Sequence, residues 1–246
     1  MLGSKSAPNI SKMLLGSATL ALVALACQAP VGGNNAPRTV EFSGHTWQVK
    51  SSAEAVGPGP NYFSDSADNV WVDGHGRLHL KLTYSDGRWY SAEVINTRSL
   101  GYGRYSFELG SPVSDFDPNV VLGLLTWSDD PAYANREIDY EFSRWGNARN
   151  RKNGQYVVMP YRWNRKRFRQ PAVVSSTQSF DWRRNAVTFT SSSGVPSTWT
   201  SRGSVPPPGS EYVHMNLWLY LGAPPKNGRT AEVIVTSFKF KPARNR

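Results

Sequence analysis

Short runs in which apolar and polar residues alternate dominate this 246-residue chain. Alternation with a period of two is typical of β-strands, and no stretch shows the sustained periodicity of an amphipathic helix. Turn-forming dipeptides such as Asp73-Gly74 and Asp86-Gly87 separate the runs. We therefore predict an all-β fold, either a sandwich of two sheets or a jelly roll. The clearest predicted strands are 77–83, 105–109, 120–127, 186–189, 214–221 and 232–240.

Residues 1–26 have the features of an export signal peptide. Two lysines precede an apolar stretch that ends at the small-residue cleavage site Ala24-Leu25-Ala26, and this stretch is too short to predict a membrane span. Cys27, the single cysteine, follows directly, so the local sequence resembles a bacterial lipoprotein processing site. We expect an exported protein, either lipid-anchored through Cys27 to the cell envelope or secreted. A tether over 27–40 would then lead to one domain over 41–246.

Basic residues outnumber acidic ones, with a formal net charge of +10 that falls to +8 when residues 1–26 and their two lysines are removed. Eight Arg and Lys residues lie between Arg149 and Arg169, with aromatic residues interleaved and no acid among them. A solvated loop beside a strand, contact with an anionic polysaccharide, or contact with nucleic acid would each give this pattern. We do not expect nucleic acid as a partner, and we expect membrane contact only through the lipid anchor.

Three acidic residues alternate with apolar ones in the segment from Glu137 to Phe142. Side chains on a strand point alternately to its two faces, so Glu137, Asp139 and Glu141 share one face while the apolar side chains pack on the other. Three like charges in a row repel one another and stabilise no strand. Such repulsion raises the pKa of one carboxyl, which suits a general acid, while a second, ionised carboxylate can attack an anomeric carbon.

The spacing of the two glutamates can be compared with the needs of that reaction. Four residues of strand place the Cα atoms of Glu137 and Glu141 about 13 Å apart. A retaining glycosidase holds its two carboxyl groups about 5–5.5 Å apart. Two glutamates that lean toward each other on a concave strand close this gap, and Asp139 between them can hydrogen-bond to one and shift its pKa. The segment therefore predicts a double-displacement glycosidase.

The segment Glu137-Ile138-Asp139-Tyr140-Glu141-Phe142 resembles the signature of glycoside hydrolase family 16, in its shorter form. Similarity to the family extends in consistent order over roughly residues 65–240, including Gly101-Tyr102-Gly103-Arg104-Tyr105 and Met215-Asn216-Leu217-Trp218. The resemblance implies a concanavalin-like β-jelly-roll sandwich of two antiparallel sheets with a concave substrate cleft. It also implies a retaining, endo-acting hydrolase of a β-linked polysaccharide, either a β-glucan or a galactan.

Site residues follow from the resemblance where the motifs match. It implies Glu137 as nucleophile, Glu141 as acid/base and Asp139 as the residue that tunes both, with sugar contacts from Glu93, Asn216 and Trp218. Tyr161 is the one match to a polar pair that contacts sugar in lichenase-like members. We add Trp127 and Trp145 because aromatic faces near the site can stack on sugars, although core packing is the alternative for both.

No cofactor is expected from the sequence. Family members often carry a structural calcium bound largely through backbone oxygens, which leave no residue signature. His75 and His79 are four residues apart, but on a strand this spacing does not indicate a zinc site. Two other functions stay open: a transglycosylase that uses the same residues, and a non-catalytic carbohydrate-binding lipoprotein. We expect a monomer.

Overall fold

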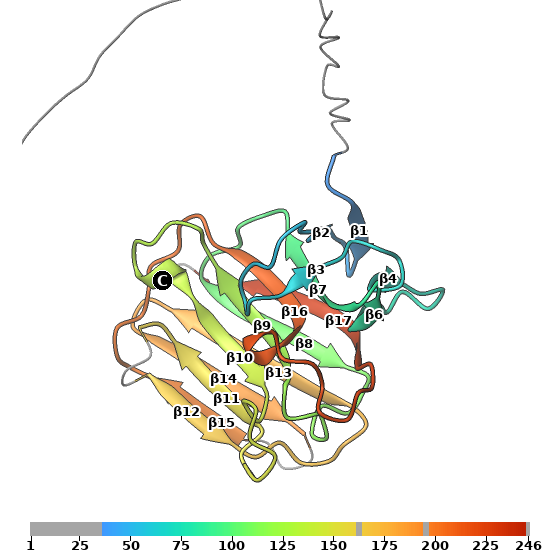
Figure 1. Ribbon diagram of the computed structural model, residues 1–246. Coiled ribbons are helices and arrows are strands. Elements are labelled where there is room, and N and C mark those ends of the chain that lie inside the picture. Colours follow the sequence, from blue (N-terminus) through green and yellow to red (C-terminus); the bar gives the residue numbers. More distant parts are fainter. Residues whose placement is uncertain (1–35, 161–163, 194–196, 245–246) are drawn as a thin grey trace, which may run out of the picture. The chain divides into compact units, whose positions relative to one another are not determined.

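The computed structural model describes residues 36–160, 164–193 and 197–244, which form two sheets packed face to face (Figure 1). These residues contain no α-helix, and their helical turns are the 3-10 turns η1 (Ala134–Arg136) and η2 (Tyr220–Gly222). Within the described part of the chain, no helix has the length and hydropathy that a membrane crossing requires. The predicted all-β sandwich is confirmed. The predicted signal peptide and Cys27 lie outside the described residues.

The larger sheet has ten strands. Eight of them follow the hydrogen-bonded order β1 (Thr39–Phe42), β2 (His45–Val49), β7 (Arg88–Asn96), β16 (Tyr212–Leu219), β9 (Val120–Trp127), β10 (Ile138–Phe142), β11 (Gly154–Val158), β12 (Arg165–Phe168). These eight pair in antiparallel fashion. Two short strands also pair with β7: β3 (Tyr62–Phe63) in parallel and β6 (Thr83–Ser85) in antiparallel fashion.

The smaller sheet has seven antiparallel strands. Their order is β15 (Ser197–Ser201), β14 (Ala186–Ser192), β13 (Ser176–Arg183), β8 (Gly103–Leu109), β17 (Glu232–Pro242), β5 (Leu78–Lys81), β4 (Val70–Val72). Consecutive strands such as β13 and β14 form hairpins, whereas β8 lies between β13 and β17, which come much later in the chain. The two sheets together make the β-jelly-roll sandwich that the sequence analysis predicts.

Apolar side chains from both sheets fill the space between them. On β10, Ile138, Tyr140 and Phe142 are completely buried, as the alternation in the sequence predicts. The Tyr140 ring packs edge-on against Tyr156 of β11 at 4.8 Å, and Tyr156 stacks on Phe189 of the other sheet at the same distance. Burial of each such side chain contributes about 1.5–3 kcal/mol to the free energy of unfolding. This packing fixes which face of β10 turns away from the core.

Two predicted strands differ from the observed ones. The predicted strand 77–83 is two strands, because the chain passes from the smaller sheet to the larger one at the buried Leu82. The predicted strand 214–221 ends at Leu219, where η2 begins. Within η2, Gly222 has a φ of +66°, and a Cβ there would lie 2.3 Å from the carbonyl oxygen of Pro60. The positive φ and the lack of room for a Cβ both require glycine at this turn.

The first strand begins at Thr39, two residues before the predicted start of the domain at 41. Thr39 pairs with Gln48 of β2, so the last residues of the predicted tether are part of the sheet edge.

Candidate active site

Cross-strand register aligns functional side chains in one row on the outward face of the larger sheet. Glu141 on β10 lies opposite Gly123 of β9 on one side and Gln155 of β11 on the other. The row continues from Gly123 to Asn216 of β16, and from Asn216 to Glu93 of β7. The residues of this row come from segments far apart in the sequence, and the antiparallel pairing alone brings them together.

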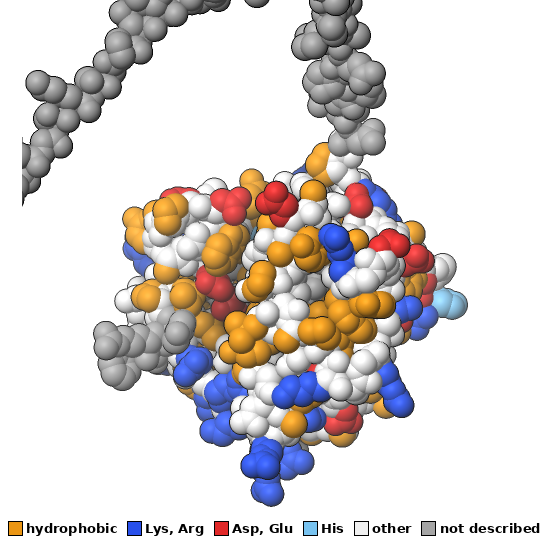
Figure 2. Space-filling view, in the orientation of Figure 1, with side chains coloured by type: hydrophobic (Ala, Val, Ile, Leu, Met, Phe, Trp, Pro, Cys, Tyr) orange, Lys and Arg blue, Asp and Glu red, His pale blue; other side chains and the backbone are white. Residues whose placement is uncertain are grey.

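A cleft of about 900 Å³ opens above this row. Figure 2 shows acidic side chains set back between apolar ones on this face, with Lys and Arg gathered toward its lower edge. The cleft brings together all the predicted site residues that the structure describes: Glu93, Trp127, Glu137, Asp139, Glu141, Trp145, Asn216 and Trp218. Tyr161, the remaining predicted sugar contact, lies outside the described residues.

A glycine, Gly123, lies between Asn216 and Glu141 in the cross-strand row. A Cβ at Gly123 would lie 2.4 Å from Asn216 Oδ1, so any side chain here would displace the asparagine. Asn216 is only 3% exposed, and its Oδ1 has no hydrogen-bond partner among the described residues. A buried acceptor without a partner is costly, and a ligand hydroxyl that entered this hollow could donate to it.

The three acids on and beside β10 have perturbed protonation. Burial, together with the charge of Glu141, raises the pKa of Glu137 above its ordinary value, while a hydrogen bond from Asp139 opposes this rise. Burial and the charges of both glutamates hold the pKa of Asp139 well above its ordinary range. The protonated form of Asp139 donates a hydrogen bond to the Glu137 carboxylate, which favours the ionised form of Glu137.

Glu141 has a separate environment. Burial raises the pKa of Glu141 to about 7, against the opposing effects of a hydrogen bond from Gln155 and the positive charge of Arg167. The amide Nε2 of Gln155 donates to Glu141 Oε2 at 2.6 Å. A carboxyl group that exchanges its proton near neutral pH is suited to general acid–base catalysis. The pKa of Glu137 is likewise raised to about 7, so the two glutamates differ in their partners, Asp139 for Glu137 and Gln155 for Glu141.

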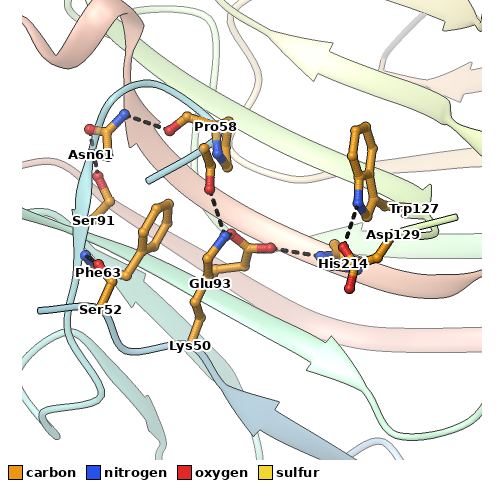
Figure 3. A network of polar contacts seen from close by, with 11 residues as sticks. Lys50, Ser52, Pro58, Asn61, Phe63, Ser91, Glu93, Trp127, Asp129 and His214 are labelled. Carbon is orange, nitrogen blue, oxygen red and sulfur yellow. Dashed lines mark hydrogen bonds and ion pairs between the residues drawn. The ribbon is translucent and has the colours of Figure 1, made fainter. Parts of the chain in front are cut away.

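Glu93 lies in an ion-pair network at another part of the cleft (Figure 3). Lys50 Nζ contacts Glu93 Oε2 at 2.9 Å, and His214 Nδ1 donates to Glu93 Oε1 at 2.6 Å. Burial alone would raise the pKa of Glu93, but its hydrogen bonds and ion pairs with His214 and Lys50 outweigh burial and lower it. Glu93 is 2% exposed, and both its carboxylate oxygens are hydrogen-bonded. In this part of the cleft the lining therefore includes the polar groups of Lys50 and His214 beside Glu93.

Replacing Lys50 by Met is expected to lower the free energy of unfolding by about 1–3 kcal/mol at pH 7, because Glu93 would keep a buried charge with one partner fewer. Urea unfolding of the purified variant measures this change. A double variant, Lys50→Met with Glu93→Gln, removes the buried charge as well and should recover part of the loss. Equal free energies of unfolding for the wild type and Lys50→Met would show that the ion pair with Lys50 does not stabilise the buried charge of Glu93.

Trp127 and Trp145 are both partly exposed in the cleft, whereas Trp218 belongs to a small buried cluster against which Trp145 packs. Trp127 is partly exposed, and its Nε1 donates to Asp129 at 3.2 Å. Trp145 packs edge-on against Trp218, with ring centroids 6.2 Å apart. Both tryptophans that were added on chemical grounds therefore line the cleft, where their ring faces can meet a sugar.

Sequence reasoning did not find four polar residues of the site, which are Lys50, Gln155, Arg167 and His214. Each contacts an acid or an amide on a neighbouring strand, and strand neighbours cannot be read from one sequence. The one indication in the sequence is the basic segment 149–169, which contains Arg167 but does not single it out from its neighbours.

A second groove, of about 860 Å³, lies on the smaller sheet. Among its described lining residues the only acid is Asp181, and Arg183 already donates hydrogen bonds to both oxygens of that carboxylate. This groove cannot provide the two carboxyl groups that double displacement needs. Within the described residues no group of three His, Cys, Asp or Glu side chains could hold a metal ion, in either groove or elsewhere.

No protein-family model and no curated protein matches the sequence. Solved structures do match. A β-glucanase of Bacillus licheniformis superimposes with a TM-score of 0.63 at 19% identity, over 80% of this chain and 92% of that one. A glycoside hydrolase family 16 endo-glucanase from Bacteroides ovatus gives a TM-score of 0.61 at 16% identity, over 79% and 94%.

A third similar structure is described as a pseudo β-1,3-glucanase and immunostimulatory antigen of Mycobacterium tuberculosis. Its TM-score is 0.61 at 18% identity, over 80% of this chain and 91% of that one. At such identities the likeness concerns the fold, which glucanases and this pseudo-glucanase share. The chain thus has the β-jelly-roll fold of family 16 β-glucanases, with its cleft on the larger sheet.

Proposed function

We propose that this protein is a retaining, endo-acting glycoside hydrolase of a β-linked polysaccharide. The observation that carries the proposal is the set of three acids that line one cleft, with a hydrogen bond from Gln155 to Glu141. Two carboxyl groups with different environments are what double displacement requires. A purely binding cleft gains nothing from burying three acids that repel one another.

In the proposed reaction Glu141 gives its proton to the glycosidic oxygen while the carboxylate of Glu137 attacks the anomeric carbon. The bond to the leaving sugar breaks and a covalent glycosyl-enzyme forms on Glu137. Glu141, now ionised, takes a proton from water, whose oxygen attacks the same carbon and releases Glu137. Two inversions at one carbon give net retention of configuration.

The charge of the cleft favours a neutral substrate. Five acids line it, namely Glu93, Asp129, Glu137, Asp139 and Glu141, whereas the basic groups in the lining are Lys50 and His214. Both of these basic groups are already bonded to Glu93, so neither is left to pair with an anionic glycan, which the basic surface left open. Similar structures are described as β-glucanases, and one is recorded with a mixed-linkage glucan product bound. We infer a neutral β-glucan as the substrate class.

A panel of lichenan, laminarin, xyloglucan, agarose and carrageenan tests the proposal by release of reducing ends. Activity on one of the glucans that disappears in Glu137→Gln is the expected result. Long transfer products in place of short oligosaccharides would indicate a transglycosylase. Binding without release would favour the non-catalytic alternative, for which the fold shared with a pseudo-glucanase is the specific support.

A further inference from the structure

Beyond the three acids, we propose that Arg167 is a positioning residue that fixes the orientation of the Gln155 amide and so decides which oxygen of Glu141 carries the transferable proton. The inference rests on the proposed function, because it concerns the residue that would act as acid and base. Its observations are the contacts of Arg167 on β12 and of Gln155 on β11, next to Glu141 in the cross-strand row.

The guanidinium of Arg167 is held in place by the backbone. Its Nη2 donates to the carbonyl oxygen of Ser143 at 3.1 Å and to that of Lys152. Its Nη1 donates to Gln155 Oε1 at 3.4 Å, and the group lies 6.0 Å from the ring of Trp145. A side chain with this many fixed donors cannot turn to the cleft surface without breaking them, so the cation facing Gln155 is a stable feature of the site.

A glutamine amide can present either its oxygen or its nitrogen to a neighbour. In this structure the oxygen of Gln155 faces Arg167 and the nitrogen faces Glu141. Rotation of the amide by half a turn would place its NH2 group against the guanidinium, where both groups donate and neither accepts. Arg167 therefore favours one orientation of Gln155, and that orientation always offers a donor to Glu141.

The consequence concerns the proton on Glu141. Because Oε2 accepts from Gln155, a proton on this carboxyl resides on Oε1, which has no hydrogen-bond partner among the described residues and belongs to a cleft-lining side chain. If the amide turned, its oxygen would accept a proton from Oε2. The acid would then hold its proton toward β11 and away from a glycosidic oxygen. Arg167 thus keeps the proton on the oxygen that is free to meet substrate.

The other charged groups near Glu141 do not supply this function. Glu137 and Asp139 beside it are acids, and on the β9 side its neighbour is Gly123. Arg167 is the positive charge that lowers the pKa of Glu141, in opposition to burial. Loss of Arg167 should therefore both free the amide and make Glu141 hold its proton more tightly.

The test compares Arg167→Met, Arg167→Lys and a matched control, Lys166→Met, on an adjacent, exposed residue of the same strand. Each is assayed on the best glucan and on an aryl glycoside whose phenolate leaves without protonation.

For Arg167→Met we expect kcat on the glucan to fall about 10- to 100-fold, part of the full effect of a general acid. The first step on the aryl glycoside should change less than threefold, and the basic limb of the pH profile should move upward. Arg167→Lys should return the basic limb of the pH profile to its wild-type position, because the positive charge is kept. It should not restore the rate on the glucan, since an ammonium group lacks the planar set of donors that holds the Gln155 amide.

A readout that needs no turnover is the side-chain amide of Gln155 in 15N-labelled protein. In the wild type one amide proton should resonate downfield because it bonds to a carboxylate at 2.6 Å, and Gln155→Ala assigns it. Loss of this shift in Arg167→Met, but not in Lys166→Met, supports the inference even if no glycan on the panel is cleaved. An unchanged shift, or equal losses on glucan and aryl glycoside, would overturn it. Inactivity of the wild type itself would count only against the proposed function.

Discussion

Replacing Glu137 by Gln is expected to lower kcat on a β-glucan by about 10⁴-fold or more, because the variant lacks the carboxylate that forms the glycosyl-enzyme. The amide keeps the shape of the side chain and cannot attack. It also removes one charge from a cluster in which burial and repulsion raise the pKa of the acids. The thermal midpoint of Glu137→Gln at pH 8 should therefore equal or exceed that of the wild type.

The sign of this stability effect follows from linkage. A buried carboxyl whose pKa is raised in the folded state binds more protons when folded, so its contribution to stability is present at low pH and is lost as pH rises through the folded pKa. Removing the Glu137 carboxyl should therefore stabilise the folded state most above pH 7. Glu41→Gln, on the exposed face of β1, is the matched control and should change neither rate nor stability.

Chemical rescue gives the Glu137 experiment a second arm. In Glu137→Ala, azide can occupy the space of the lost carboxylate and attack the anomeric carbon, provided that the substrate has a good leaving group. The product should be a glycosyl azide of inverted configuration, because a single displacement replaces two. Full activity of Glu137→Gln combined with a lowered thermal midpoint would refute the assignment, since Glu137 would then be a structural residue.

The part of the site that could be predicted from sequence is the part that lies on one strand. Alternation from Glu137 to Phe142 determined both the acidic face and the buried face, since side-chain direction on a strand is local geometry. Asn216 and Trp218 were accessible only through the resemblance of a second strand to a known motif. In both cases the information is contained within a few consecutive residues.

The part that could not be predicted depends on which strands are neighbours. Lys50 meets Glu93 across 43 positions of sequence, and His214 meets it across 121. β16 lies between β7 and β9, although more than eighty residues separate it from either. The pattern of one strand does not encode its partner, which is set by how all the apolar faces pack together. The Arg167–Gln155–Glu141 contact requires this register as well.

The second large effect is expected for Glu141→Gln, which should lower glucan hydrolysis by about 10²- to 10⁴-fold. The wild-type rate should fall as pH rises through about 7, because the first step needs a protonated Glu141 and burial raises the pKa of Glu141 to about that value. An amide neither gives nor takes a proton in this range, so the basic limb of the kcat profile should disappear in the variant. The low residual rate should then no longer fall as pH rises through 7, while its rise with the ionisation of Glu137 should remain.

An aryl glycoside distinguishes loss of the acid from a general loss of structure. Its phenolate departs without a proton, so Glu141→Gln should still form the glycosyl-enzyme on Glu137. The second step then lacks its base, and water attacks slowly. The covalent intermediate should accumulate, visible as a burst of phenolate equal to the enzyme concentration and as intact protein heavier by one glycosyl unit. If the variant keeps the basic limb and gives no burst, Glu141 is not the acid/base, and the proton must come from another group in the cleft.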